Sequence, residues 1–416
     1  MQPILPLKGK KMTYEQNLDG CHHSKNDKAP LHTFLQSNAL ETFREVYHKG
    51  QLAPLSLVDQ QDDIKLYQSA ATQFENFEDI LILGTGGSSL GGKTFYALAT
   101  QKRPRLHFID NIDPYTFTKL FEIINTKKAG VLVISKSGST IETLFQLLIC
   151  LQHFEKQNIR NHFIVITEPT PNPLRKIAAD YNWMCLDHPT NVGGRYSCFS
   201  VVGLLPAILA ELNPYAIREG AQTVLKQHIT NDLPPAFEAA AMAVYLENHH
   251  KKTLSVMLPY ADQLDSFALW YRQLWAESLG KKEKGSTPIR AIGTVDQHSQ
   301  LQLYLDGPKD KYFTILTPQW QGRGERISSS LIPELQNKTM GDLFAAEQRA
   351  TYETLVRHQC PTRLITLDTL NESSLGALMM HFMIETILTS YLIGVNAFDQ
   401  PAVEEGKRLA REFLAA

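Results

Sequence analysis

The feature that most constrains the fold of this chain is a repeated alternation of short apolar runs with longer stretches of helical spacing. The apolar runs are bounded by turn or polar residues, and runs of this kind are typical of buried parallel strands. They cover residues 79–83, 106–109, 131–134, 163–167, 253–258, 289–293, 312–317 and 364–367. The alternation predicts an α/β protein built from doubly wound, largely parallel sheets.

The helical stretches indicate how the chain is divided. They cover residues 140–153, 201–212, 236–248, 266–279, 375–391 and 403–414. Between residues 191 and 252 the strand-like runs pause, and helical patterns separated by prolines take over. A chain of 416 residues suggests about two or three domain-sized units. We expect an N-terminal extension over residues 1–50, a first α/β domain over 51–212, a second over 213–395 and a C-terminal helical segment over 396–416.

Charge and composition narrow the class of protein. The chain has 41 Lys and Arg residues against 43 Asp and Glu residues, so its net charge of −2 does not attract nucleic acid or an anionic membrane. The most apolar stretch, residues 375–395, carries His381 and Glu385 near its middle, which favours a buried helix over a membrane span. The first residues lack the uninterrupted apolar stretch and small-residue cleavage site of a secretory signal, so we do not expect export. The five cysteines are scattered. We expect a cytoplasmic protein with reduced cysteines and with no membrane segment or nucleic-acid partner.

Two turns rich in glycine and hydroxyl groups follow neighbouring expected strands. Residues 84–94 (G-T-G-G-S-S-L-G-G-K-T) follow the run 79–83, and residues 135–140 (S-K-S-G-S-T) follow the run 131–134 and open a helix. Backbone N–H groups in such turns, together with the positive end of the following helix, favour a bound anion. Because both turns lie at the carboxyl ends of strands, we expect one cleft that binds a phosphate monoester.

The sequence leaves two other interpretations of these turns open. Residues 87–94 also satisfy the pattern G-x-x-x-x-G-K-[ST] of a P-loop, and Asp110 follows the next strand as a magnesium-holding aspartate would. A nucleotide-hydrolysing or kinase-like protein is therefore the first alternative. A tight turn with a helix cap and no ligand is the second, for either turn taken alone. The second turn favours the phosphate monoester over the nucleotide, because its hydroxyl groups lie at a helix start.

The run S-K-S-G-S-T-I-E-T, residues 135–143, resembles the sugar-isomerase fold of enzymes and regulators that bind phosphosugars. Further segments bring the resemblance closer to the glucose-6-phosphate isomerase family, particularly its bacterial form. They are residues 192–197 (V-G-G-R-Y-S), 275–281 (W-A-E-S-L-G-K), 285–288 (G-S-T-P), 293–300 (G-T-V-D-Q-H-S-Q), 305–308 (L-D-G-P), 390–394 (S-Y-L-I-G) and 398–407 (F-D-Q-P-A-V-E-E-G-K). The resemblance runs in order from near Asp79 to near Arg411.

The resemblance implies two sugar-isomerase domains and an enzyme that interconverts glucose 6-phosphate and fructose 6-phosphate through an enediolate, without cofactor or metal. It implies that Glu277 is the catalytic base and that Arg195 steadies the enediolate. His298 and Lys407 would serve ring opening, and His298 would reach the active site of the neighbouring subunit of a homodimer. The residues implied in binding the sugar phosphate are Gly87, Ser88, Ser135, Lys136, Ser137, Thr140 and Gln400.

An aldose–ketose isomerisation requires these residue types. A carboxylate must remove a carbon-bound proton beside a carbonyl, and a fixed positive charge can stabilise the enediolate that forms. The substrate is mostly cyclic, so a separate acid–base pair must open the ring, and histidine suits this step because its ordinary pKa of about 6.5 lies near working pH. The sequence departs from the family at Ala402, where glycine is usual, and a methyl group there is tolerated only where φ is negative.

Two related functions stay open on the sequence alone. A phosphosugar isomerase of broader range would also accept mannose 6-phosphate, and nothing in the loops excludes it. A phosphosugar-sensing regulatory module needs no base, so it would leave Glu277, His298 and Lys407 unexplained.

Overall fold

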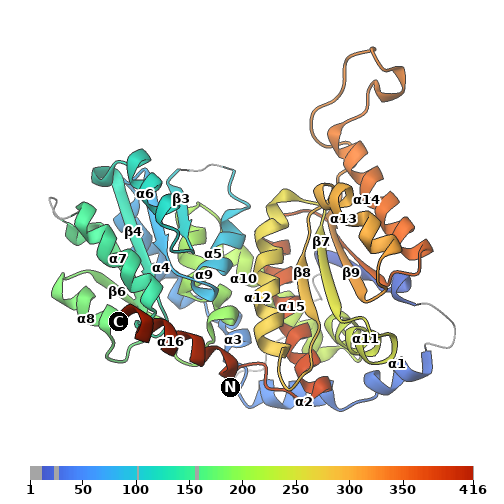
Figure 1. Cartoon of the computed structure of the whole chain (residues 1–416), viewed down its shortest axis with the longest axis horizontal. Helices are drawn as coiled ribbons and strands as arrows, with labels where there is room; N and C mark the ends of the chain where they lie inside the picture. Colours follow the sequence, from blue (N-terminus) through green and yellow to red (C-terminus); the bar gives the residue numbers. More distant parts are fainter. Residues whose placement is uncertain (1–11, 23–27, 101–102, 155–158, 416) are drawn as a thin grey trace.

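The computed structural model describes residues 12–22, 28–100, 103–154 and 159–415 of the chain. Two α/β lobes lie side by side along the long axis of the molecule, and each is built around a five-stranded sheet (Figure 1). Helix α12 (Asp265–Leu279) of the second lobe packs against α5 (Gly87–Tyr96) of the first, at the junction of the lobes. Both sheets are largely parallel and flanked by helices, so the predicted α/β class is confirmed.

The first sheet is wholly parallel, with the strand order β3-β2-β4-β5-β6. Its strands are β2 (Asp79–Leu83), β3 (Arg105–Ile109), β4 (Ala129–Ile134), β5 (Phe163–Thr167) and β6 (Met184–Asp187). Ile80 and Ile82 pack into the core on one face of the sheet, and Leu81 and Leu83 pack into the core on the other. Helices therefore cover both faces, which is why the central strands read as continuous apolar runs. These helices are α5 and α9 (Val201–Leu209) on one face and α6 (Pro114–Ile123), α7 (Ile141–Phe154) and α8 (Pro173–Asp180) on the other.

The second sheet has the order β1-β10-β9-β7-β8, and only its edge strand β1 (Tyr14–Asn17) is antiparallel. Its other strands are β7 (Leu254–Pro259), β8 (Thr287–Arg290), β9 (Lys311–Pro318) and β10 (Thr362–Leu367). The helices of this lobe are α10 (Pro214–Thr230), α11 (Pro235–His250), α12, α13 (Val295–Asp306), α14 (Met340–Arg357) and α15 (Glu372–Ile393). The helical region between the two sheets, which was expected from the pause in the strands, is formed by α9, α10 and α11.

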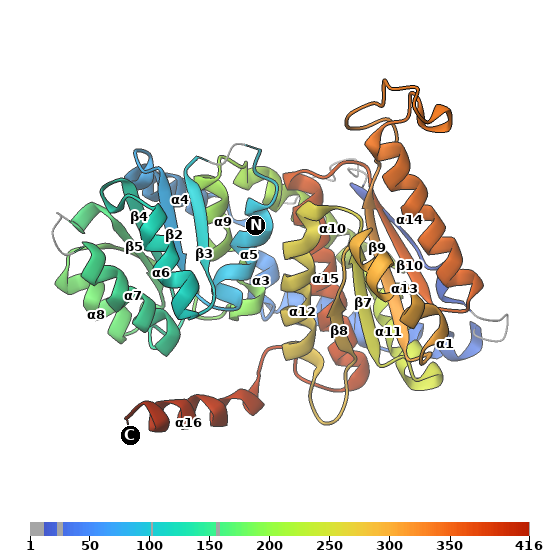
Figure 2. The ribbon, with the colours of Figure 1, turned by 45° about the horizontal axis from the view of Figure 1, so that its top comes forward.

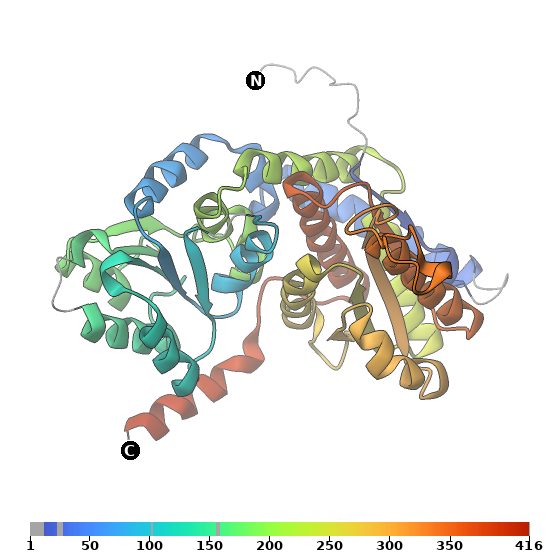
Figure 3. The same cartoon turned by 90° about the horizontal axis from the view of Figure 1, so that it is seen from above.

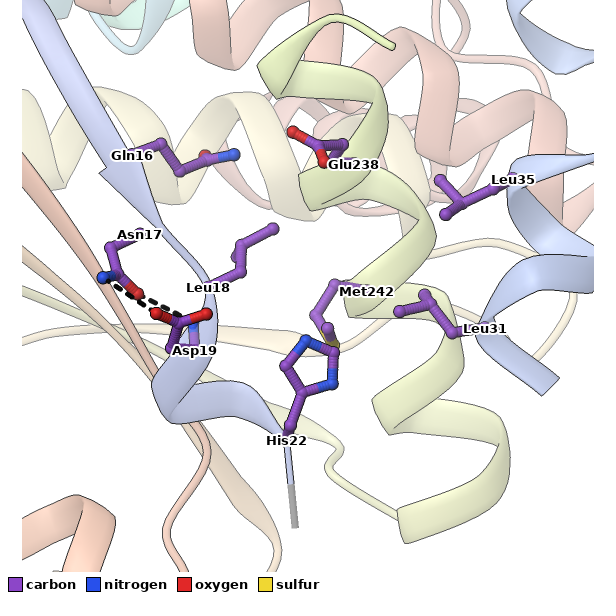
Figure 4. Close-up of a pocket in the computed structure, with 9 residues that line it drawn as sticks. All are labelled: Gln16, Asn17, Leu18, Asp19, His22, Leu31, Leu35, Glu238 and Met242. Atoms are coloured by element: carbon purple, nitrogen blue, oxygen red, sulfur yellow. Dashed lines mark hydrogen bonds between the residues drawn. The ribbon is translucent and has the colours of Figure 1, made fainter. Parts of the chain in front are cut away.

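Part of the expected N-terminal extension, residues 1–50, lies in the second sheet. Strand β1 pairs with β10, and the hydroxyl of buried Tyr14 lies 2.7 Å from Nδ1 of His381 in the core. A cavity of about 320 Å³ lies between β1, α1 (Lys28–Leu35) and α11, and none of the predicted site residues lines it (Figure 4). Residues 1–50 also contain α2 (Ala39–His48), and α3 (Ala53–Ser56) and α4 (Asp62–Ala71) follow before β2.

Three strands differ from the sequence-based prediction, and all three lie at sheet edges. Strands β1 (Y-E-Q-N) and β6 (M-C-L-D) were not predicted, and β8 was expected at residues 289–293 but covers Thr287–Arg290. Each of them is partly exposed along its length. An edge strand has a neighbour on one side only, so its sequence need not be a continuous apolar run.

Helix α15 is the central core helix of the second lobe. It is the one helix in the described part of the chain that is long and apolar enough to cross a membrane, and 89% of its most apolar window is buried inside the fold. Close packing with α10 depends on glycine, because a Cβ atom on Gly220 would lie 1.8 Å from the carbonyl oxygen of Ser373. Glu385, near the middle of α15, pairs with Arg363 at 2.8 Å, so the predicted buried helix is confirmed.

The C-terminal segment forms α16 (Glu404–Ala415), as predicted. This helix leaves the second lobe and extends along the first (Figures 2 and 3). Ala410 and Leu414 line a largely apolar cavity of about 500 Å³ together with α6 and α7. The side chains of α16 are nonetheless mostly exposed, and Phe413 is 76% exposed. All five cysteines are free, and four of them are buried, as expected of reduced core thiols.

Candidate active site

The glycine turn after β2 brings three parts of the chain into contact. Gly86 has φ +55°, a conformation that favours glycine, and it precedes α5. A Cβ atom on Gly87 would lie 2.2 Å from the carbonyl carbon of Gly194, so this turn contacts residues 193–195 (G-G-R). A Cβ atom on Gly86 would lie 2.7 Å from Nε2 of Gln273 on α12. Ser88 lies next to this contact, half-buried in the first turn of α5.

The P-loop interpretation of residues 87–94 is wrong. Helix α5 begins at Gly87, so Gly92 and Lys93 lie inside the helix and not in a loop. A Cβ atom on Gly92 would lie 2.9 Å from the proline ring of α9, so this glycine lets the two helices pack closely. Lys93 forms an ion pair with Asp110 at 2.9 Å. A P-loop instead holds its lysine at the junction of loop and helix, where it faces the phosphates.

The loop after β4 gathers the hydroxyl groups that were predicted to bind phosphate. Ser135 is buried, and its hydroxyl donates to Oγ1 of Thr140 at 3.1 Å. Ser137 is exposed at the tip of the loop. Gly138 has φ +63°, and a Cβ atom there would lie 1.8 Å from Oδ1 of Asn172, so only glycine fits. Helix α7 begins directly after Thr140, which places the loop at the positive end of that helix.

The two turns lie next to each other at the carboxyl edge of the first sheet. Strands β2 and β4 are hydrogen-bonded neighbours, and a Cβ atom on Gly84 would lie 3.0 Å from the carbonyl oxygen of Ile134. Lys136 donates to the carbonyl oxygen of Thr190 at 3.0 Å, and its Nζ lies 3.5 Å from the carboxylate of Glu168. A bound anion at this edge would therefore find hydroxyl groups, a helix start and a lysine together.

One buried histidine lies behind this loop. His188 follows β6, is 1% exposed, and has Nδ1 2.9 Å from the carbonyl oxygen of Pro189. The pKa of His188 is lowered to about 4, chiefly by burial and to a lesser extent by the positive charge of Lys136, while the hydrogen bond with the Pro189 carbonyl opposes this shift. His188 is therefore neutral at neutral pH and adds no charge to the loop.

Arg195 is fixed by hydrogen bonds around its whole guanidinium group. The residue is 4% exposed, and Nε donates to Oγ of Ser278 at 2.8 Å. Nη1 donates to Oε2 of Glu277 at 3.1 Å and to Oε1 of Gln400 at 2.8 Å. Nη2 donates to two backbone carbonyl groups of segment 396–400, at 2.6 and 3.0 Å. A buried guanidinium with this many acceptors keeps its charge and its orientation.

Glu277 lies at the end of α12, between two donors. Its Oε2 accepts from Arg195, and its Oε1 accepts from Nε2 of Gln273 at 2.9 Å. The side chain is 35% exposed, so part of it remains accessible while both carboxylate oxygens accept hydrogen bonds. The fold thus places Arg195, Glu277 and Gln400 in one cluster, which also adjoins the glycine turn through Gly194.

Sequence reasoning missed Gln273. It precedes Glu277 by four residues, so both lie on one face of α12, and that spacing was the available signal. Oε1 of Gln273 is buried and has no hydrogen-bond partner among the described residues. The Nε2 assignment follows from chemistry, because only the amide nitrogen can donate to a carboxylate.

The structure does not bring His298 and Lys407 to this cluster. His298 lies exposed in the first half of α13, in the second lobe. Lys407 lies on α16, where its side chain is 57% exposed and pairs with Glu404 at 2.7 Å. Among the residues that the structure describes, the side-chain bonds of Glu277 go to Arg195 and Gln273 and to neither of these two groups.

Comparison with protein families gives one match over most of the chain. The family model described as "Phosphoglucose isomerase" matches residues 59–308. A curated protein of Methanococcus maripaludis named "Probable glucose-6-phosphate isomerase" is 35% identical over 408 residues, which covers 96% of this chain and 92% of that protein. The glucose-6-phosphate isomerase of Rubrobacter xylanophilus is 37% identical over 350 residues, which covers 80% of this chain and 81% of the relative.

The fold is also similar to that of solved structures. The crystal structure of a glucose-6-phosphate isomerase from Chlamydia trachomatis matches with a TM-score of 0.82 and covers 97% of this chain and 88% of that chain. Its sequence identity to this chain is 20%, so this likeness concerns the fold alone.

Proposed function

The chain belongs to the phosphoglucose isomerase family and interconverts glucose 6-phosphate and fructose 6-phosphate, a step of glycolysis, and we propose that Glu277 is the base of this reaction. The observation that carries this proposal is the position of its carboxylate. It lies between the Arg195 guanidinium and the Gln273 amide, and 35% of the side chain is exposed. The cluster adjoins the glycine turn, because Gly87 lies against Gly194.

Glu277 would remove the proton from C2 of the open-chain aldose and return it to C1. Both carbons are adjacent, so one carboxylate reaches each of them in turn. Arg195 would stabilise the negative charge that develops on the enediolate oxygens, because its guanidinium is permanently charged and already oriented. Gln400, which accepts a hydrogen bond from Arg195, would contact the substrate from the side of segment 396–400.

The phosphoryl group would bind the loop after β4. Ser135, Ser137 and Thr140 offer hydroxyl groups, and Lys136 offers an ammonium group whose described bonds use a carbonyl and a carboxylate oxygen. The start of α7 adds the positive end of a helix dipole. Gly87 and Ser88, in the neighbouring turn, would contact the sugar between the phosphoryl group and Glu277.

We test the base by replacing Glu277 with glutamine, which keeps the size of the side chain and removes its basicity. E277Q should lower kcat by about 10²–10⁴ and change KM by no more than a few-fold, because a general base acts in the transition state. Isomerisation of fructose 6-phosphate by the purified protein, in excess chelator, measures both constants. E283Q, a change on the exposed turn after α12, is the matched control. An E277Q enzyme that keeps most of its kcat would show that another group is the base.

We propose a homodimer in which His298 of one subunit serves ring opening in the active site of the other, and in which Lys407 assists that step. The support is the location of His298, exposed on α13 and without a described contact to Glu277 or Arg195. Histidine can act as acid and base near neutral pH, which ring opening requires.

Mixing two impaired variants tests the shared site. An E277Q subunit paired with an H298N subunit has one site that combines an intact Glu277 with an intact His298 from the other chain. Random pairing after co-refolding should therefore restore roughly a quarter of wild-type activity if the site is shared in a two-fold dimer. If both residues act within one chain, every site in the mixture carries one lesion, and no activity returns.

The location of the enzyme and the limits of its domains are further proposals. We propose that it acts in the cytoplasm, which is supported by the glycolytic reaction of its family. We also propose that the two sugar-isomerase domains cover residues 51–212 and 213–395. The first range contains the whole first sheet, and the second contains the four parallel strands of the second sheet, whose antiparallel edge strand β1 comes from residues 1–50.

A further inference from the structure

The orientation of Arg195 depends on a short segment at the surface of the second lobe. Segment 396–400 follows the end of α15 and contributes three of the acceptors of the Arg195 guanidinium, which are the carbonyl groups of Ala397 and Asp399 and the side chain of Gln400. Ala397 is buried, but the other residues of the segment are exposed, and they belong to no helix or strand. A segment of this kind needs specific contacts to keep one conformation.

Lys281 supplies such contacts from the end of α12. Its Nζ forms an ion pair with the carboxylate of Asp399 at 2.9 Å and donates to the carbonyl oxygen of Asn396. The same ammonium donates to the carbonyl oxygen of Ser278 at 3.0 Å, so it links the segment to the helix end that carries Glu277. The Lys281 side chain is only 12% exposed, which leaves the pair less screened than two fully exposed charges.

We infer that Lys281 is a positioning residue of the isomerisation, which holds segment 396–400 on α12 and thereby keeps Arg195 and Gln400 beside the base. Its three described partners are two carbonyl groups and the Asp399 carboxylate, so it acts through Arg195 and not on the substrate. The inference rests on the proposed catalytic roles of Glu277 and Arg195. It gives a role to Lys281, the last residue of the W-A-E-S-L-G-K segment of the sequence.

K281M removes the charge and the donors but keeps most of the side-chain stem. We expect kcat to fall by about 10–10² and KM to change by no more than a few-fold, because a displaced guanidinium loses contact with the enediolate more than with the bound substrate. K281R should recover most of the lost kcat, since a guanidinium can also donate to the Asp399 carboxylate. If Lys281 had only a structural role, K281M would lower the melting temperature without lowering kcat selectively over KM.

Lys284 provides the matched control. It lies on the same turn and donates to the carbonyl oxygen of Ile393 at 2.7 Å, at the end of α15, without a described contact to segment 396–400. K284M should keep kcat within about two-fold of the wild-type value, because it changes a helix end and not the partners of Arg195. Wild-type kcat in K281M, or equal losses in K281M and K284M, would overturn the inference.

D399N removes the same ion pair by changing its more exposed partner. It tests the inference even if K281M does not fold. D399N should lower kcat in the same direction, and the K281M/D399N double variant should be no slower than K281M, because both changes break one interaction. Full kcat in D399N would overturn the inference. The test of Lys281 can fail separately from the test of Glu277 as the base. An active E277Q enzyme would refute Glu277 as the base, whereas the Lys281 variants are compared only with the wild-type enzyme.

Discussion

Two regions of the molecule differ in whether the folded single chain already brings their proposed catalytic side chains into contact. In the junction cluster, which consists of Arg195, Gln273, Glu277 and Gln400, side chains from separate parts of the chain are already bonded to one another. On the outlying helices α13 and α16, His298 and Lys407 are exposed and lie outside those bonds. The proposed proton-transfer groups are thus assembled by folding, whereas the proposed ring-opening groups have still to be brought to the substrate.

Burial explains the difference. A guanidinium that is 4% exposed, such as Arg195, must find acceptors inside the protein, and the fold supplies them from α12 and from segment 396–400. Exposed side chains can be satisfied by water, and the described ion pair of Lys407, with Glu404, is itself a surface pair. The described residues therefore hold His298 and Lys407 less firmly than they hold Arg195. The comparison predicts that changes in the two regions affect different steps of the reaction.

After E277Q, the largest effect should follow from removing the positive charge of the junction cluster. R195M should lower kcat by about 10²–10³, because a preorganised donor is lost at the position where the enediolate charge develops. The measurement is kcat for fructose 6-phosphate, together with a melting curve, since the buried acceptors of Arg195 lose their donor. R290M, which breaks an exposed ion pair with Asp265, is the control and should keep kcat. Unchanged kcat in a folded R195M enzyme would contradict the comparison.

The next effect should separate ring opening from proton transfer. H298N should slow conversion of the cyclic hexose phosphates by about 10–10², but it should leave the enzyme active on a shorter aldose phosphate that cannot close a six-membered ring. E277Q should be inactive on both substrates. Equal losses of H298N on cyclic and acyclic substrates would place His298 in the proton-transfer step and remove the distinction between the two regions.

The same comparison shows what the sequence could predict. The buried strands β2, β4 and β5 were predicted because burial on both faces makes them continuous apolar runs, and the phosphate loop was predicted because it follows one of them. The partly exposed edge strands β1 and β6 lack that pattern. Their position depends on pairing with distant segments, which a local pattern does not contain.

The site divides in a similar way. Glu277 and Arg195 were predicted from the family resemblance, but their bond to each other joins residues 82 positions apart and was visible only in the fold. Gln273 could have been found from its spacing of four residues from Glu277 on a helix. No sequence pattern would have shown that segment 396–400 supplies acceptors to Arg195, because that depends on how the end of α15 meets α12.

A smaller effect should come from α16. K407M should lower kcat by about 10-fold or less, because Lys407 is proposed to assist ring opening and not to replace His298. The melting temperature should stay unchanged, since the Lys407 side chain is 57% exposed and its described ion pair is a surface pair with Glu404. R411M, on the same exposed helix, is the control. If K407M, but not R411M, lowered the melting temperature clearly, Lys407 would contribute more to the packing of α16 than its exposure indicates.

The smallest effect at neutral pH should come from the histidines that folding buries. Burial lowers the pKa of His188, behind the phosphate loop, to about 4, and that of His228, on α10, to about 3, against an ordinary value near 6.5. The unfolded chain therefore binds protons below about pH 6.5 that the folded chain does not bind. The stability that these neutral histidines contribute is complete above that pH and is lost as the pH falls toward 4.

Urea unfolding between about pH 7 and pH 4 measures this loss. H188N keeps a donor for the Pro189 carbonyl and removes one titrating group, so its stability should fall less steeply with acid than that of the wild type. H298N, on exposed α13, should keep the wild-type slope. Two results would contradict this prediction: a wild-type dependence of the free energy of unfolding on pH in H188N, or a weaker dependence in H298N. Either would show that buried and exposed histidines do not differ in their effect on stability.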